Sequence, residues 1–127
     1  MDTHAAVQGW IDGWTRGWSA HDPGPIVALY APDAVFVSHP FRDPQAPGEY
    51  AEWAFGDEDE ADFRFGEPVV GGGSAAVEYW ALIRSGEREQ TLAGVAVIRF
   101  GPDGRVVEQR DYWAMEDGRR DPPPGWR

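Results

Sequence analysis

The sequence contains no cysteine, lysine or asparagine, and each absence excludes a kind of chemistry. Without cysteine the chain has no disulfide framework, thiol nucleophile or thiolate metal site. Without lysine it forms no Schiff base and has no phosphate-loop lysine, and without asparagine it has no N-glycosylation acceptor. No apolar run approaches the roughly 18 residues of a membrane span, and no basic and apolar leader precedes the first helical pattern. We therefore expect a soluble, cytoplasmic protein with no membrane partner.

Positive charge is also scarce, because 22 acidic residues stand against 11 basic ones, all arginine, for a net charge of −11. This balance argues against nucleic acid as a partner, since phosphate binding requires positive patches. Apolar and aromatic residues, in contrast, are plentiful: 42% of the chain is hydrophobic and seven residues are tryptophan. In a chain of 127 residues, that composition predicts one domain with a buried core.

Periodicity predicts three helices and then a meander of strands. In the first segment the helical face is formed by Val7, Trp10, Ile11, Trp14 and Trp18. Short helices are expected over 26–30, which follows Pro25, and over 49–55. Strands are predicted over 34–39, 63–70, 75–84, 89–100 and 105–115, and glycine-containing turns separate the last four. The acidic run 57–60 is interpreted as a solvated connector.

This order of elements predicts an α+β fold, because helices must cover one face of the sheet. We expect a curved antiparallel sheet wrapped around three N-terminal helices. The predicted domain spans residues 1–116, and residues 117–127 form a proline-rich tail. Three consecutive prolines make that tail irregular, and we expect Trp126 to dock against a neighbouring surface.

Several short stretches carry a family resemblance. They are His21-Asp22, 26–34, His39-Pro40-Phe41, Ile98-Arg99-Phe100, 103–106 and Asp111-Tyr112-Trp113. Together they resemble the nuclear-transport-factor-like superfamily, which includes ketosteroid isomerases, SnoaL-like polyketide cyclases and limonene-epoxide hydrolases. The resemblance covers the chain from about Trp10 to Trp113. It implies a cone-shaped apolar cavity that takes a small, largely apolar ligand through a few placed polar groups.

The catalytic side chains of the isomerases are not carried over at the matched positions. His39 stands where the isomerases have their base, Ala96 where they have a second acid, and Trp14 where they have a tyrosine. Arg110-Asp111-Tyr112 reproduces the end of the last strand of the epoxide hydrolases. Their Arg-x-Asp on an earlier strand corresponds here to Glu78-Tyr79-Trp80.

Strand alternation and this match together define a candidate site. Glu78 and Trp80 share one face of their strand, and the match turns that face toward the cavity. The match also turns toward the cavity the face of the last strand that carries Gln109, Asp111 and Trp113. We expect Glu78 as the first choice of proton acceptor, Asp111 as the second, and His39 as a group that relays a proton or polarises a carbonyl. The expected ligand-binding residues are Trp14, Trp53, Trp80, Gln109 and Trp113, with Gly94 and Ala96 leaving room for the ligand.

Each candidate also has a purely structural interpretation. Glu78 is either exposed at a rim or paired with Arg42, and Asp111 is paired with Arg110, with Arg105 or with a backbone cap. His39 is an ordinary turn histidine. Their spacing is not that of a tight metal site, so we expect no metal and no cofactor.

The resulting hypothesis is a SnoaL-like small-molecule-binding protein that acts as an isomerase, cyclase or hydrolase. It would use general acid/base chemistry on an apolar carbonyl or polyketide-like compound. The alternatives are a non-catalytic ligand-binding or accessory protein and a purely structural dimer module. We also expect a homodimer through the outer sheet face, which this assignment lines with Val77, Tyr79, Ile83, Val95 and Val97.

Overall fold

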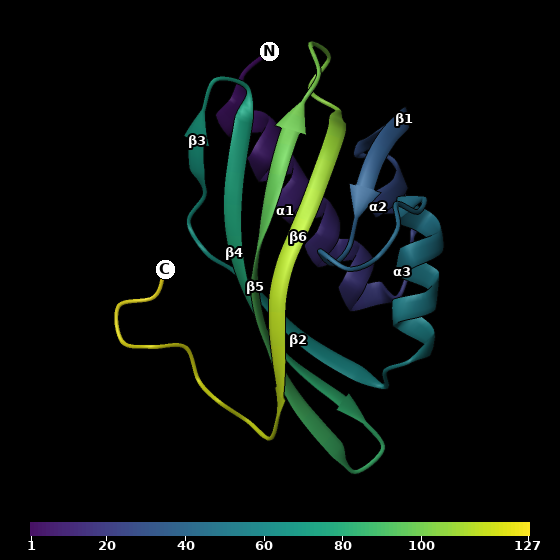
Figure 1. Ribbon diagram of the computed structural model, residues 1–127, viewed down its shortest axis with the longest axis vertical. Coiled ribbons are helices and arrows are strands. Elements are labelled where there is room, and N and C mark those ends of the chain that lie inside the picture. The colour runs from purple at the N-terminus through teal and green to yellow at the C-terminus, as the bar shows by residue number, and fades with distance from the viewer.

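The computed structural model describes residues 1–127 and consists of helices on one face of a six-stranded sheet (Figure 1). Helix α1 spans Thr3–Ala20, α2 spans Gly24–Val27 and α3 spans Pro47–Gly56. Helix α1 begins where the Asp2 carboxylate accepts a hydrogen bond from the backbone N–H of Ala5, and it ends at His21, whose φ of 49° is left-handed. The predicted face of α1, which includes its three tryptophans, is buried. The three predicted helices are therefore confirmed.

The sheet is mixed, although most of it is antiparallel. Its strands are β1 (Tyr30–Val37), β2 (Glu60–Phe65), β3 (Val69–Gly71), β4 (Ser74–Ser85), β5 (Arg88–Phe100) and β6 (Val106–Asp117). Their order is β1-β6-β5-β4-β2, and β3 pairs with the opposite end of β4 from β2. Long antiparallel ladders join β4, β5 and β6. The predicted α+β fold with an antiparallel sheet is confirmed for most of the sheet, and β1 adds one parallel pairing with β6 at its edge.

Two predicted elements have different bounds in the structure. The strand predicted over 63–70 is two strands, β2 and β3, separated by Gly66, Glu67 and Pro68. Pro68 has no N–H to donate to a ladder, which accounts for the interruption. The helix predicted to reach Tyr30 ends at Val27, and Tyr30 is already the first residue of β1.

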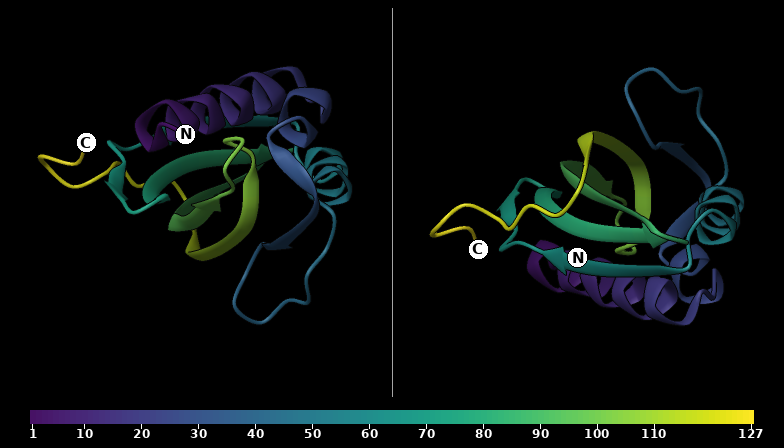
Figure 2. Two further views of the ribbon diagram at one scale, coloured as in Figure 1. Left: turned by 90° about the horizontal axis from the view of Figure 1, so that it is seen from above. Right: turned by 90° about the horizontal axis from the view of Figure 1, so that it is seen from below.

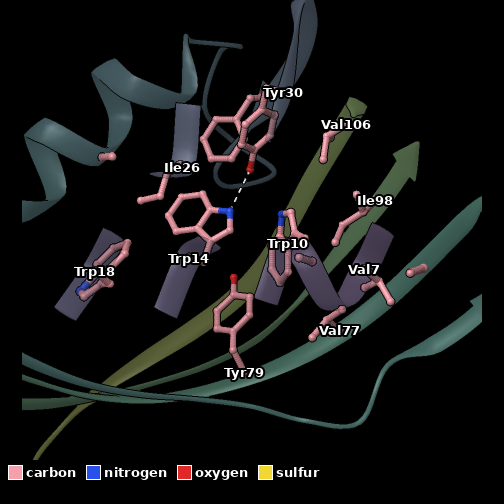
Figure 3. Packing of buried hydrophobic residues seen from close by; sticks show 14 of the residues in the cluster. Val7, Trp10, Trp14, Trp18, Ile26, Tyr30, Val77, Tyr79, Ile98 and Val106 are labelled. Atoms are coloured by element: carbon pink, nitrogen blue, oxygen red, sulfur yellow. Dashed lines mark hydrogen bonds between the residues drawn. The ribbon is translucent and has the colours of Figure 1, made fainter. Parts of the chain in front are cut away.

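The core lies between α1 and the concave side of the sheet, as the end-on views show (Figure 2). Trp10, Trp14 and Trp18 point from successive turns of α1 toward the strands, and Tyr79 points back toward them from β4 (Figure 3). Burying this much aromatic surface is the main contribution to the stability of the fold. No helix is long and apolar enough to cross a membrane.

The tail that follows β6 is irregular and turns back beside the edge of the sheet that β3 and β4 form (Figure 1). The Trp126 ring packs edge-on against Trp80, with the ring centroids 6.3 Å apart, and the Arg64 guanidinium lies 5.5 Å from the Trp126 ring. The Trp80 indole N–H also donates to the backbone oxygen of Arg120, at 2.7 Å. The tail is thus docked through Trp126, in the way that the sequence predicts.

Candidate functional site

A cavity of about 350 Å³ opens between α1, α3 and the concave side of the sheet. Most of its lining is aromatic or aliphatic, and α1 supplies three tryptophans one helical turn apart. The rest of the aromatic wall comes from α3, β2, β4 and β6, through Tyr50, Trp53, Phe63, Phe65, Tyr79 and Trp113. Such a lining suits a small, largely apolar ligand that is oriented by a few polar groups.

The central polar group is the carboxyl of Asp111, which β6 directs into this cavity. It accepts hydrogen bonds from Gln109 Nε2 at 2.9 Å and from the Tyr79 hydroxyl at 3.2 Å. Burial raises the pKa of Asp111 to about 7, and these two hydrogen bonds only partly offset that effect. No arginine pairs with it, because Arg110 on the other face of β6 pairs with Glu108. A carboxyl with this pKa exchanges protons readily near neutral pH.

The side chain of Gln109 is held in one orientation by a buried network. Its Oε1 accepts hydrogen bonds from the Trp10 indole N–H, at 2.9 Å, and from the Tyr30 hydroxyl. The Trp14 indole N–H donates in turn to the Tyr30 oxygen, at 3.0 Å (Figure 3). Since an indole N–H only donates, Oε1 must face Trp10 and the amide N–H₂ must face Asp111. The network therefore presents a fixed donor to the carboxyl.

Arg42 is the cation beside the aromatic wall. Its guanidinium lies 5.1 Å from the Trp53 ring and 5.3 Å from the Trp113 ring, and Nη1 donates to Ser38 Oγ at 3.1 Å. It forms no ion pair with a carboxylate. Because Arg42 lines the cavity, its remaining N–H groups are available to a ligand oxygen.

A second carboxyl at the cavity is the buried one of Glu58, in the turn between α3 and β2. Burial raises its pKa to about 7, and the neighbouring Trp18 indole partly offsets the rise. The sequence predicts that the whole acidic run is solvated, and this prediction is wrong for Glu58. Glu58 is buried and lines the cavity, whereas Asp59 and Glu60 are exposed.

The structure does not bring Glu78 to the cavity. Glu78 is exposed on the outer face of β4, beside Trp80 and a shallow groove, whereas Val77 and Tyr79 are buried on the inner face. The face assigned to this strand from the resemblance is wrong by one residue, and period-two alternation then moves every side chain to the other side. Trp80 consequently contacts the tail rather than the cavity. Nor does Glu78 form an ion pair with Arg42.

The other predicted residues are placed as follows. The structure brings together around the cavity four aromatic or polar side chains, those of Trp14, Trp53, Gln109 and Trp113. His39 lies behind them: its ring packs edge-on against Trp113 at 4.7 Å, its Nδ1 accepts from the Phe41 backbone N–H, and it does not line the cavity.

The room expected at Gly94 is filled by β6. A Cβ at Gly94 would lie 2.5 Å from the Cβ of Trp113, so this glycine permits the close approach of two strands. Ala96 is fully buried and does not line the cavity either.

Reasoning from the sequence missed Tyr79 as a partner of the Asp111 carboxyl, and it missed Tyr30 and Trp10 as the donors that hold Gln109. One signal could have placed Tyr79 correctly: the residues Val77, Tyr79, Ala81 and Ile83 form the more apolar face of β4, and the more apolar face is the one that a strand buries. No signal in the sequence indicates that Glu58 differs from its acidic neighbours.

Residues 7–109 match the model of the SnoaL-like domain family. The chain belongs to the SnoaL-like family. None of the curated proteins is significantly similar to this SnoaL-like chain. No group of three or more histidine, aspartate or glutamate side chains in it is arranged to hold a metal ion.

Solved structures share the fold of this SnoaL-like domain. The epoxide hydrolase/cyclase-like enzyme SalBIII, which has a role in pyran ring formation in the polyether salinomycin, superposes with a TM-score of 0.78 and 18% identity, covering 92% of this chain and 98% of SalBIII. A SnoaL-like protein of unknown function from Burkholderia thailandensis has 26% identity and a TM-score of 0.67, over 90% of this chain and 99% of that one. An LEH-like epoxide hydrolase from Mycobacterium tuberculosis has 14% identity and a TM-score of 0.65. The superposition covers 86% of this chain and 82% of that one.

Proposed function

We propose that this protein binds a small, largely apolar carbonyl compound in the aromatic cavity and moves a proton on it, with Asp111 as the general acid/base. The observation that carries the proposal is the setting of Asp111. Its carboxyl is partly buried, faces the cavity and is held by the neutral donors of Gln109 and Tyr79 rather than by a cation. A carboxyl held in this way is both basic enough and acidic enough to transfer protons near neutral pH.

The remaining groups supply orientation and charge stabilisation. In the proposed complex the apolar body of the ligand packs against the tryptophans of α1, and Arg42 donates to the carbonyl oxygen. Removal of a proton α to the carbonyl by the Asp111 carboxylate leaves an enolate, whose negative oxygen Arg42 stabilises. Reprotonation from the Asp111 carboxylic acid at the same carbon exchanges the proton, and reprotonation at a different carbon of a conjugated enolate completes an isomerisation. His39 acts indirectly, through its packing against Trp113.

The similarity to an epoxide hydrolase/cyclase-like enzyme and to an epoxide hydrolase supports acid/base chemistry in a cavity of this shape. Ring closure and water addition require the same kind of proton transfer by a buried carboxyl. The non-catalytic alternative, a ligand-binding or accessory protein, uses the same cavity without turnover. An experiment must therefore measure binding and proton transfer separately.

Deuterium exchange of β-tetralone, a bicyclic ketone with acidic α protons, measures proton transfer directly. In heavy water we expect the protein to accelerate exchange at the α carbon, as followed by proton NMR. Asp111→Asn should lower the rate about 100-fold or more, because an amide cannot accept the proton. Ketone affinity, measured by calorimetry, should change less than about threefold. The matched control is Asp62→Asn, which makes the same change on an exposed residue of β2.

Other outcomes contradict the proposal in identifiable ways. Binding of the ketone without accelerated exchange in the wild type would favour the accessory-protein alternative. Equal exchange rates for the wild type and Asp111→Asn would remove Asp111 from the chemistry. Failure of a panel of monocyclic and bicyclic ketones to bind would overturn the ligand class.

We also propose a homodimer through the outer sheet face, with a different set of residues from the predicted one. Val77, Tyr79 and Ile83 lie on the inner side, whereas Val97 and Tyr112 are exposed on the outer side, with Val95 between them. An exposed apolar row of this kind suits a two-fold interface.

Light scattering at micromolar concentration should give twice the 14.1 kDa of one chain. Val97→Asp should halve that mass, while the control Val69→Asp, on exposed β3, should leave it unchanged. A monomeric wild type would contradict this interface.

A further inference from the structure

The cavity has a second polar end that the proposed chemistry at Asp111 does not use. Asp111 is linked through Gln109 to Trp10, whereas Glu58 lies beside Trp18, two turns further along α1. At 1.5 Å per residue, the two tryptophans are about 12 Å apart along the helix axis. Both carboxyls line the same cavity, with the Tyr50 side chain near each of them.

Two polar atoms at this second end have no hydrogen-bond partner. They are Glu58 Oε1 and the Trp18 indole Nε1, and both are buried. The His21 ring lies beside this end: its Nε2 is 3.6 Å from Glu58 Oε1, beyond hydrogen-bond distance, and the ring is stacked on Phe55. A buried acceptor and a buried donor without partners destabilise the unliganded protein, and a ligand that satisfies both gains affinity.

We propose that Glu58 and Trp18 form a subsite for a ligand hydroxyl, so that the ligand is an apolar hydroxy-carbonyl compound. A hydroxyl donates one hydrogen bond and accepts others, so one group can donate to Glu58 Oε1 and accept from Trp18 Nε1. A ligand carbonyl satisfies only the indole, and a ligand ammonium satisfies only the carboxylate. The carbonyl group of this ligand is inferred from the proposed function. Its hydroxyl group is inferred from the two unpartnered atoms, Glu58 Oε1 and Trp18 Nε1.

The subsite is reached by a small movement. Both atoms are covered in the unliganded arrangement, but the side chains that carry them line the cavity. The last torsion of a glutamate side chain is broad, so the carboxyl turns with little strain and admits the hydroxyl between itself and the indole. The aromatic surroundings exclude competing water and strengthen both hydrogen bonds.

A series of three related ketones tests the subsite. The probes are β-tetralone, a hydroxy-β-tetralone with its hydroxyl on the ring carbon farthest from the carbonyl, and the methyl ether of the latter. By calorimetry we expect the wild type to bind the hydroxy compound at least tenfold more tightly than the parent ketone. The ether should show no such preference, because it accepts from Trp18 but donates nothing to Glu58.

Variants locate the preference. Glu58→Met keeps the length of the side chain and removes both acceptors, and Trp18→Phe keeps a ring and removes the donor. Each variant should reduce the hydroxyl preference to less than about threefold. Glu58→Met should change the affinity for the parent ketone little, whereas Trp18→Phe should weaken all three ketones by a common factor, because Trp18 is also part of the apolar wall. The matched control Glu52→Met, on the exposed side of α3, should keep the full preference. A purely structural role for Glu58 would instead weaken the binding of all three ketones alike.

Failure of the subsite and failure of the proposed function are distinguishable. The preference should survive in Asp111→Asn, because it involves no proton transfer. A preference for the hydroxy ketone without deuterium exchange would support the subsite and contradict proton transfer by Asp111. Deuterium exchange without that preference would support proton transfer and contradict the subsite. Equal affinities of the wild type for all three ketones, a preference retained in Glu58→Met, or no binding of any probe would each overturn the subsite.

Discussion

Two carboxylates occupy neighbouring rows of the same sheet and have opposite environments. One row, on the inner face, aligns Val77, Ala96 and Asp111 across β4, β5 and β6. The next row, on the outer face, begins at Glu78 and continues through Val95. Asp111 is partly buried in the aromatic cavity, whereas Glu78 is exposed to solvent. The difference shows that the parity of a residue along its strand, rather than its residue type, decides whether a carboxyl in this fold faces the cavity or the solvent.

The largest expected effect compares these two carboxyls in the deuterium-exchange assay. Glu78→Gln should change the exchange rate less than about twofold, because the side chain does not reach the cavity. Asp111→Asn should lower it about 100-fold or more. A large loss in Glu78→Gln, with binding retained, would show that the outer face takes part and would break the comparison.

A smaller effect concerns the dependence of folding stability on pH. The pKa of Asp111 is raised from an ordinary 3.8 to about 7 in the folded chain. The folded state therefore binds the proton more tightly than the unfolded state. This contribution to stability is complete below about pH 4 and is lost as the pH rises through about 7. Between about pH 5 and pH 8 it amounts to roughly 2.5 kcal/mol at 1.36 kcal/mol per pKa unit.

Urea unfolding at both pH values measures this slope. Asp111→Asn should remove most of the Asp111 contribution and leave that of Glu58, whose raised pKa acts in the same direction. The exposed Glu78 offers a contrast, since Glu78→Gln should keep the wild-type slope. A slope unchanged in Asp111→Asn would mean that the carboxyl is not buried in solution.

The smallest effect concerns the outer face and its tail. Trp126→Ala removes the ring that packs on Trp80, and we expect a loss of about 1 kcal/mol, or about 4 °C in Tm. Deletion of residues 117–127 should lower Tm further. The aromatic control is Phe41→Ala, because Phe41 is 93% exposed and its removal should change Tm by less than about 2 °C. Thermal unfolding by circular dichroism reports all three, and an unchanged Tm in the deletion would show that the tail contributes nothing.

The sequence predicts much of this fold because its signals are local. The tryptophans of α1 recur at helical spacing, and glycine turns separate β3, β4, β5 and β6. These local patterns predict the helices and strands with small errors at their ends. The pairing of β1 with β6 does not emerge, because it joins residues such as Val37 and Arg110 that are far apart in the chain. Nothing local in either strand records which partner it has or in which direction that partner runs.

The site was half predictable for a related reason. On β6, alternation and the resemblance agree, so Gln109, Asp111 and Trp113 face the cavity as expected. On β4 the resemblance and the apolar pattern disagree about which face is buried, and the apolar pattern is right. Glu58 was not predictable, because only the tertiary position of the α3–β2 turn distinguishes it from its exposed acidic neighbours.

The parallel pairing of the first and last strands also governs when the molecule can assemble. Tyr30 aligns with Val106, and nearly the whole meander lies between them. Closing so long a loop is entropically costly, and such contacts form late and slow folding. During synthesis β1 leaves the ribosome without its partner β6, and Gln109 meets the donors of Trp10 and Tyr30 only after β6 emerges. Trp10 and Trp18 can pack against Phe65 and Phe63 once β2 has emerged, whereas β1 stays unpaired until β6 is complete, which makes β1 the element that waits longest for its partner during translation.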